Sequence, residues 1–200
     1  GNVPELVSVL PRERSWLRGS EHLEQRAFWA AHAGMALVWL GEERAGLRRL
    51  RKCVADSGSK SLASTEAQAA RTIAELALVQ RRLLSARRWF QRSLRLRDSD
   101  LSIVIPACLG LGRAALLQDD QAGVRVAVAR LQGLLGPGAP PDLSLAIQEL
   151  EAYVLHLGNR FADAKRVHAE AVSGLRALDL APVEILAEWH FGRSLLTTDL

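Results

Sequence analysis

Small side chains that return about every 40 residues constrain this sequence most strongly. The first column is spaced by 40, 38, 40 and 40 residues, at Gly34, Ala74, Gly112, Ala152 and Gly192. A second column recurs with a similar spacing at Gly46, Ala86, Val124 and Ala164. Several columns in step indicate internal repetition of one structural unit.

Each unit is expected to be a pair of helices joined by a short polar or glycine-containing turn. The pairs are predicted over residues 28–54, 68–96, 106–135 and 146–175, with a fifth first helix at 183–196 that lacks its mate. Turns are predicted at residues 41–43, 81–82, 119–120 and 158–159. Alanine and leucine supply most of the apolar residues and favour helices. No useful run alternates apolar and polar residues, so strands are not expected.

The two columns have a simple packing explanation. Two helix backbones cross closely only where side chains are small, and a bulky residue then fills the space beside the crossing. Such residues follow the second column by four positions, at Leu50, Phe90, Val128 and His168. One pair cannot bury its apolar face alone, so neighbouring pairs must stack.

Local signals predict where helices start and where loops lie. Candidate N-caps are Ser20, Ser61 or Ser64, and Asp142. Pro106 and Pro182 are placed near the starts of helices, where the missing N–H is tolerated. The strongest loops are predicted at residues 56–60 and 136–141.

This arrangement resembles the tetratricopeptide repeat. The resemblance is clearest at residues 157–164, Leu-Gly-Asn-Arg-Phe-Ala-Asp-Ala, which look like that family's turn and second-helix start. The period exceeds the common repeat of about 34 residues. It is similar to the helical-repeat arrays of large bacterial regulators, such as maltose-activator-type and LuxR-type ATP-dependent transcription factors. The resemblance covers about residues 24–197 and implies an all-α, right-handed α-α superhelix of about four and a half repeats.

The repeat also predicts the domain organisation. Residues 1–19 fit no repeat and are interpreted as a cap or the remnant of a preceding helix. Residues 20–200 are expected to form one domain, with repeats at about 24–57, 62–98, 101–136, 142–179 and a partial one at 182–197. Because the last helix lacks a mate, we expect a fragment of a larger bacterial signalling or transcription-regulatory protein, with self-association through that helix as an option.

Motifs for chemistry are missing from the sequence. No His-x-x-x-His pair, P-loop or nucleophile elbow occurs, and Cys53 and Cys108 have no metal-ligand spacing. We therefore expect no enzyme, cofactor or metal. Without a signal peptide or a membrane-spanning apolar run, and with two cysteines expected to be reduced, a cytoplasmic location is expected.

The family geometry implied by the resemblance places part of each first helix in a concave groove. Candidate partner contacts there are Arg71, Glu75, Arg113, Glu149, Tyr153, His156, Trp189 and Arg193. Charges on these apolar helices are expected to be either exposed in the groove or paired with one another. Arginine and tyrosine beside apolar residues suit an extended peptide or a helix. The resemblance also implies a small-molecule inducer for some relatives.

The second helices of the first two pairs are rich in arginine. Residues 1–100 carry 18 basic and 11 acidic side chains, whereas residues 101–200 carry 8 and 11. The cluster comprises Arg48, Arg49, Arg87, Arg88, Arg92 and Arg95, expected on the convex face without acidic residues spaced to neutralise it. It is either a solvated outer face or a patch for nucleic acid or an acidic protein.

From the repeat and the missing catalytic motifs, the leading hypothesis is a non-catalytic protein-interaction or effector-sensing module.

Overall fold

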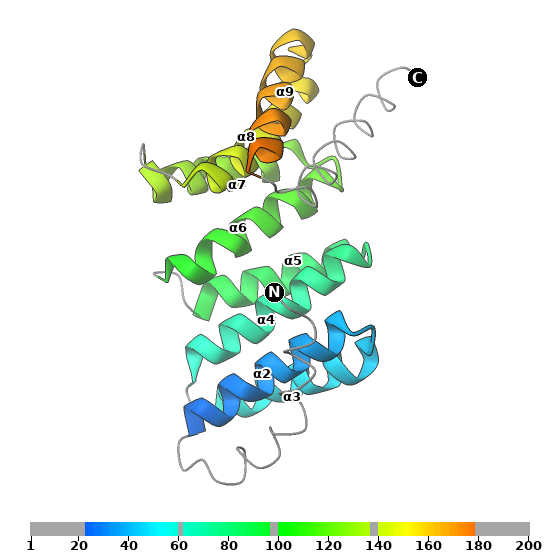
Figure 1. Cartoon of the computed structure of the whole chain (residues 1–200), viewed down its shortest axis with the longest axis vertical. Coiled ribbons are helices and arrows are strands. Elements are labelled where there is room, and N and C mark those ends of the chain that lie inside the picture. Colours follow the sequence, from blue (N-terminus) through cyan, green and yellow to red (C-terminus); the bar gives the residue numbers. More distant parts are fainter. Residues whose placement is uncertain (1–22, 60–61, 97–99, 137–139, 179–200) are drawn as a thin grey trace. The chain divides into compact units, whose positions relative to one another are not determined.

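A computed structural model describes residues 23–59, 62–96, 100–136 and 140–178 of the chain. Every regular element in these ranges is an α-helix, so the predicted all-α class is confirmed (Figure 1). The helices are α2 (Leu23–Trp39), α3 (Glu43–Ser59), α4 (Ala63–Val79), α5 (Leu83–Leu96), α6 (Leu101–Leu116), α7 (Gln121–Leu135), α8 (Pro141–Leu157) and α9 (Phe161–Ala177). None of the described helices combines the length and apolarity needed to span a membrane.

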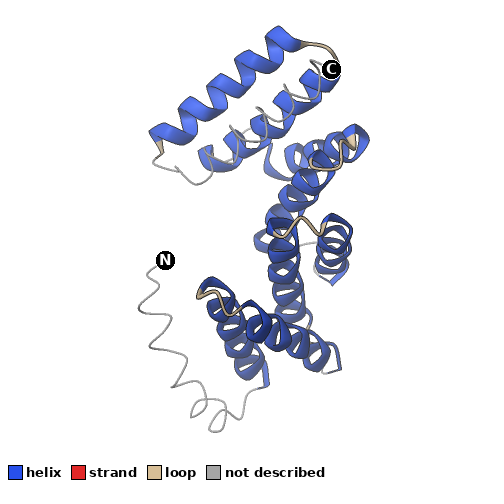
Figure 2. Cartoon of the chain, turned by 90° about the vertical axis from the view of Figure 1, so that its right-hand side faces the viewer, coloured by secondary structure: helices blue, strands red, loops and turns tan. Residues whose placement is uncertain are grey.

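Consecutive helices form four hairpins, as the repeat predicts. Short loops join α2 to α3, α4 to α5, α6 to α7 and α8 to α9 (Figure 2). Each of the four predicted turns falls at one of these loops. The molecule is therefore an all-helical array consistent with a helical-repeat solenoid.

The array divides into two compact units, Gly1–Ala107 and Cys108–Leu200, with the boundary inside α6. We call them the N-terminal and C-terminal units. In the N-terminal unit α4 packs against α2, α3 and α5. In the C-terminal unit α8 packs against α7 and α9. The prediction of one continuous domain over residues 20–200 stays a prediction.

All four hairpins turn in the same way. The left-handed residue of each turn occupies an equivalent position, with φ of 85°, 57°, 55° and 59° at Gly41, Arg81, Asp119 and Asn159. In the last hairpin Asn159 N–H donates to His156 O at 3.0 Å and Arg160 N–H donates to Leu155 O at 2.9 Å. The same two backbone bonds recur at the equivalent positions of the other three hairpins, which is a Schellman-type helix end. The repeat is thus present in the backbone, not only in the sequence.

The first hairpin confirms the packing explanation of the columns. A Cβ added to Gly46 would lie 2.7 Å from Gly34 O, so α2 and α3 cross backbone to backbone here. A Cβ added to Gly34 would lie 2.8 Å from Cγ of Leu50, the bulky residue expected beside the crossing. Leu50 and its equivalent Phe90 are fully buried, and Val128 is buried too, whereas His168 is only half-buried.

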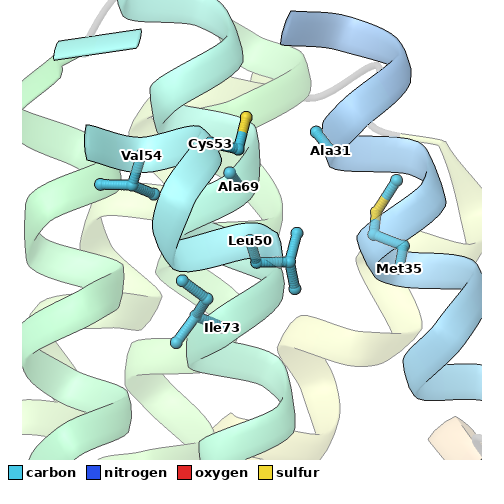
Figure 3. Close-up of a cluster of buried hydrophobic side chains, with 7 residues drawn as sticks. All are labelled: Ala31, Met35, Leu50, Cys53, Val54, Ala69 and Ile73. Carbon is cyan, nitrogen blue, oxygen red and sulfur yellow. The ribbon is translucent and has the colours of Figure 1, made fainter. Parts of the chain in front are cut away.

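Stacking between hairpins shares one core in the N-terminal unit. Figure 3 shows a cluster drawn from three helices of two hairpins: Ala31 and Met35 of α2, Leu50, Cys53 and Val54 of α3, and Ala69 and Ile73 of α4. In the C-terminal unit the column residue Gly112 serves stacking as well. A Cβ there would lie 2.7 Å from Leu150 of α8.

Two predicted boundaries are wrong. The sequence predicts a loop at residues 56–60. Instead α3 continues through this polar stretch to Ser59. Gly58 of that stretch lies close to α4, where an added Cβ would be 3.1 Å from Glu66 Oε2. The helix expected to begin near Pro106 begins at Leu101, so this proline lies inside α6.

The predicted N-caps that fall within the described residues are also wrong. Asp142 does not cap α8, because Pro140 is the N-cap and Pro141 takes the first helical position, where its fixed φ is pre-organised. Ser64 lies inside α4, whose N-cap is Leu62. Ser20, Ser61, Pro182 and the fifth helix at residues 183–196 lie outside the described residues.

Candidate interaction surfaces

The groove candidates of the N-terminal unit form an ion pair on one helix. Arg71 and Glu75 lie one turn apart on α4, and Arg71 Nη1 donates to Glu75 Oε1 at 2.6 Å. Their side chains are 22% and 46% exposed. Of the two alternatives for these charges, pairing is therefore realised here, and both side chains still reach solvent.

The groove candidates of the C-terminal unit form a buried pair between two helices. Arg113 Nη2 of α6 lies 3.3 Å from Glu149 Oε2 of α8, and the Glu149 side chain is only 2% exposed. Among the described residues Glu149 Oε1 receives no hydrogen bond, and Arg113 Nε finds no acceptor. Burial raises the pKa of the Glu149 carboxyl, although Arg113 opposes the shift. This pair is incompletely satisfied, and such a carboxylate is costly to keep charged.

Tyr153 and His156 join α8 to its neighbours. The Tyr153 hydroxyl donates to Asp119 Oδ1 at 2.8 Å, in the turn between α6 and α7. His156 is 1% exposed, and its ring meets Phe161 of α9 edge to face at a centroid distance of 5.1 Å. We define Arg113, Glu149, Tyr153 and Asp119 as the polar clasp.

Glu149, Tyr153 and His156 are buried in the C-terminal unit, and for Glu149 the pairing alternative is realised through Arg113. Each is less than 5% exposed, because its polar or aromatic group contacts the preceding hairpin or α9. Their roles in partner binding stay predictions, as do those of Arg71, Glu75 and Arg113. Trp189 and Arg193 lie outside the described residues.

A second surface lies on α3, on α5 and on Arg82, the residue just before α5. Seven basic side chains are exposed there and form no ion pair with any described residue: Arg44, Arg48, Arg51, Lys52, Arg82, Arg88 and Arg95. We call these seven residues the basic surface. Of the predicted arginine cluster it contains Arg48, Arg88 and Arg95. Arg49 and Arg87 are half-buried and make other interactions, and burial lowers the pKa of Arg49.

Arg92 is left out of this surface because its charge is paired, although its side chain is 43% exposed. Its Nε and Nη2 donate to Glu66 Oε1 at 3.0 and 2.6 Å, and its guanidinium carbon lies 5.6 Å from the Trp89 ring centroid. Glu66 is only 5% exposed, so the sequence expectation that no acid neutralises the cluster is wrong at Arg92. Next to this pair Ser93 Oγ donates to Ala67 O at 2.8 Å, which fixes the start of α4 to the end of α5.

Sequence reasoning missed two exposed apolar residues beside the basic surface. Leu84 is 68% exposed and Val79 is 80% exposed, at the end of the hairpin where α4 gives way to α5. The repeat offered a signal, since Leu84 occupies the position equivalent to Arg44, which faces solvent one hairpin earlier.

The described ranges contain both cysteines of the chain and further side chains of metal-ligating type. Cys53 and Cys108 are free and buried, as expected for small apolar residues, and burial raises the pKa of both thiols. In the four described segments no three His, Cys, Asp or Glu side chains come together to hold a metal ion. No family model matches the chain, and neither a curated protein nor a solved structure is significantly similar to it.

Proposed function

We propose that this chain is a non-catalytic helical-repeat module that binds another protein or a peptide. One observation carries the proposal: four hairpins share the same turn, with the same backbone bonds, at equivalent positions. Arrays of such units use their apolar residues for stacking, and they offer extended polar faces to partners.

The repeat is best interpreted as tetratricopeptide-like. The backbone crossing at Gly34 and Gly46, with Leu50 beside it, supports that interpretation. The period near 40 residues supports a place in a bacterial signalling or transcription regulator of the maltose-activator or LuxR type, in which the module would sense an effector or a partner.

The N-terminal unit is our choice for the partner-binding region. Its groove pair, Arg71 and Glu75, reaches solvent, whereas Glu149 of the C-terminal unit is buried. A partner can exchange this half-exposed pair for its own charges at lower cost, because ion pairs that reach solvent contribute little stability. Opening the buried pair would cost far more.

Site-specific cross-linking in the source cells tests this function. A photo-reactive amino acid replaces Gln91 on α5, and a matched control replaces Ala169 on α9; both positions are exposed. We expect one protein to be cross-linked reproducibly from position 91 and to bind the purified chain with a Kd of about 1 μM or tighter. If every cross-linked protein fails to bind saturably once purified, the interaction proposal is wrong.

Nucleic-acid binding is the second candidate. The cations of the basic surface, which form no ion pair within the described part of the chain, favour an anionic partner, whatever its class. A small-molecule inducer remains an expectation from the resemblance, and no observation on the described residues adds to it.

A further inference from the structure

The positive charge of the N-terminal unit is not a requirement of the repeat. Arg48, Arg88 and Arg166 occupy equivalent outward positions on α3, α5 and α9. On α9 the charge is neutralised one turn later, where Arg166 Nη1 donates to Glu170 Oε1 at 2.9 Å. The positions equivalent to Glu170 are Lys52 and Arg92. A merely solvated face would suit the paired pattern of α9, whereas Arg48 and Lys52 lie one turn apart with like charge and repel. Arg92 differs, because Glu66 neutralises it.

The cations of α3 and α5 act on the same side of the N-terminal unit. Both helices pack against α4, and they are the second helices of adjacent hairpins. Stacked repeats present equivalent residues to the same side, so Arg48 and Arg88 add their fields. Helix α5 itself has no acidic residue.

Apolar exposure beside the cations distinguishes the classes of anionic partner. Leu84 precedes Arg88 by one helical turn, and 68% of it is exposed. A phosphodiester backbone offers no apolar group to contact an exposed aliphatic side chain. An acidic protein segment can place apolar residues against that side chain. Stacking of bases requires open aromatic faces. Trp89, the aromatic residue nearest Arg88 in sequence, packs on the core and lies under Arg92.

We propose that the basic surface binds an acidic segment of a partner protein that carries at least one large apolar side chain. The arginines pair with its carboxylates, for which the guanidinium fork is well matched. Leu84 receives the apolar side chain. This inference rests on the proposed interaction function and names the surface and the partner chemistry.

The test measures binding of the full chain to defined probes by fluorescence anisotropy. The first probe is a peptide of Glu, Asp and Leu, the second has each Leu replaced by Ser, and the third is an oligonucleotide in single- and double-stranded form. The test variant is Arg48→Glu with Arg88→Glu. The matched control is Arg125→Glu with Arg130→Glu, which changes charge equally at two exposed residues of α7. Circular dichroism checks each fold, and Arg48→Gln with Arg88→Gln substitutes for a variant that does not fold.

We expect the leucine-containing peptide to bind most tightly. The test variant weakens it at least tenfold and the control less than threefold, while Leu84→Ser weakens it at least threefold and leaves the serine peptide unchanged. Equal weakening by test and control, or tighter binding of the oligonucleotide without dependence on Leu84, overturns the proposal. If the cross-linked partner still binds the test variant at full affinity, the interaction function stands and this surface is wrong.

Discussion

The two units solve the same stacking problem with different chemistry. In the N-terminal unit α2, α3 and α4 meet through an apolar cluster, and the nearby charges Arg71 and Glu75 pair at the surface. In the C-terminal unit α6 and α8 meet through Gly112 and Leu150 and also through the polar clasp, with Glu149 buried. Arg71 and Glu149 occupy equivalent positions, so the repeat specifies where a side chain lies and leaves its chemistry open.

The difference suggests distinct uses. A buried polar contact is costly when it is broken, so it favours one arrangement of neighbouring helices. An apolar core places no demand on the charges of the outer residues. The first half of the chain also carries more charged side chains than the second half. The C-terminal hairpins therefore carry the polar contact that is costlier to break, and the N-terminal hairpins carry the exposed cations.

The largest contrast is expected from removing one arginine of each pair. Arg113→Met leaves Glu149 buried without a counter-charge and should lower the free energy of unfolding by about 3–5 kcal/mol. Arg71→Met leaves Glu75 largely solvated and should cost less than about 1 kcal/mol. Urea denaturation measures both. Adding Glu149→Gln to Arg113→Met should restore most of the loss, and equal costs for the two single variants would contradict the comparison.

A glycine at the crossing and one at the surface give the next contrast. Gly46→Ala places a methyl group against Gly34 O and the backbone of Val38, and should cost about 1–3 kcal/mol. Gly133 on α7 has nothing within 4 Å of an added Cβ, so Gly133→Ala should stabilise by about 0.5–1 kcal/mol. Thermal melting of the two variants measures this difference. Melting temperatures that shift in the same direction would contradict the close backbone crossing of α2 and α3.

The turn position offers a smaller effect. Gly41→Ala meets no atom within 4 Å, but its φ of 85° suits glycine, so the variant should lose about 1 kcal/mol. Asn159→Gly should change stability by only a few tenths of a kcal/mol, because asparagine tolerates this conformation. Denaturation midpoints measure the stability of both variants. If Gly41→Ala leaves the midpoint unchanged, the result would argue against the shared turn.

The pH dependence of the clasp has a defined sign. Since the pKa of Glu149 is raised above its ordinary 4.5 in the folded chain, the folded state binds the proton more tightly. The contribution of this group therefore favours folding at low pH, and it declines as pH rises from about 4.5 through the folded pKa. Subtracting the stability curve of Glu149→Gln from that of the wild type isolates this decline. A difference that grows with pH would have the wrong sign.

The sequence could predict the hairpins because their spacing reflects backbone contact. In the first hairpin Gly34 and Gly46 are small because α2 and α3 cross backbone to backbone there. The groove could not be predicted in the same way. Glu149 pairs with Arg113, which lies 36 residues earlier on another helix, and no local sequence pattern reports that pairing.

The surface residues fall between these cases. Arg48 and Arg88 are exposed as expected, since they lie opposite the buried side of their helices. Arg92 is one turn from Arg88, yet it pairs with Glu66, which lies 26 residues earlier on another helix. Leu84 could have been found by aligning hairpins, because its equivalent Arg44 belongs to the outer face. Tertiary pairing therefore limits what periodicity alone can assign.

Because all four hairpins share one turn, each hairpin is a self-contained structural unit. In all four, the same pair of backbone bonds closes the end of the first helix, although glycine occupies the left-handed position in only one of them. A hairpin copied or deleted between equivalent positions would keep its own closure. Gene duplication can then lengthen or shorten the array one hairpin at a time, while the outward residues of each copy diverge independently.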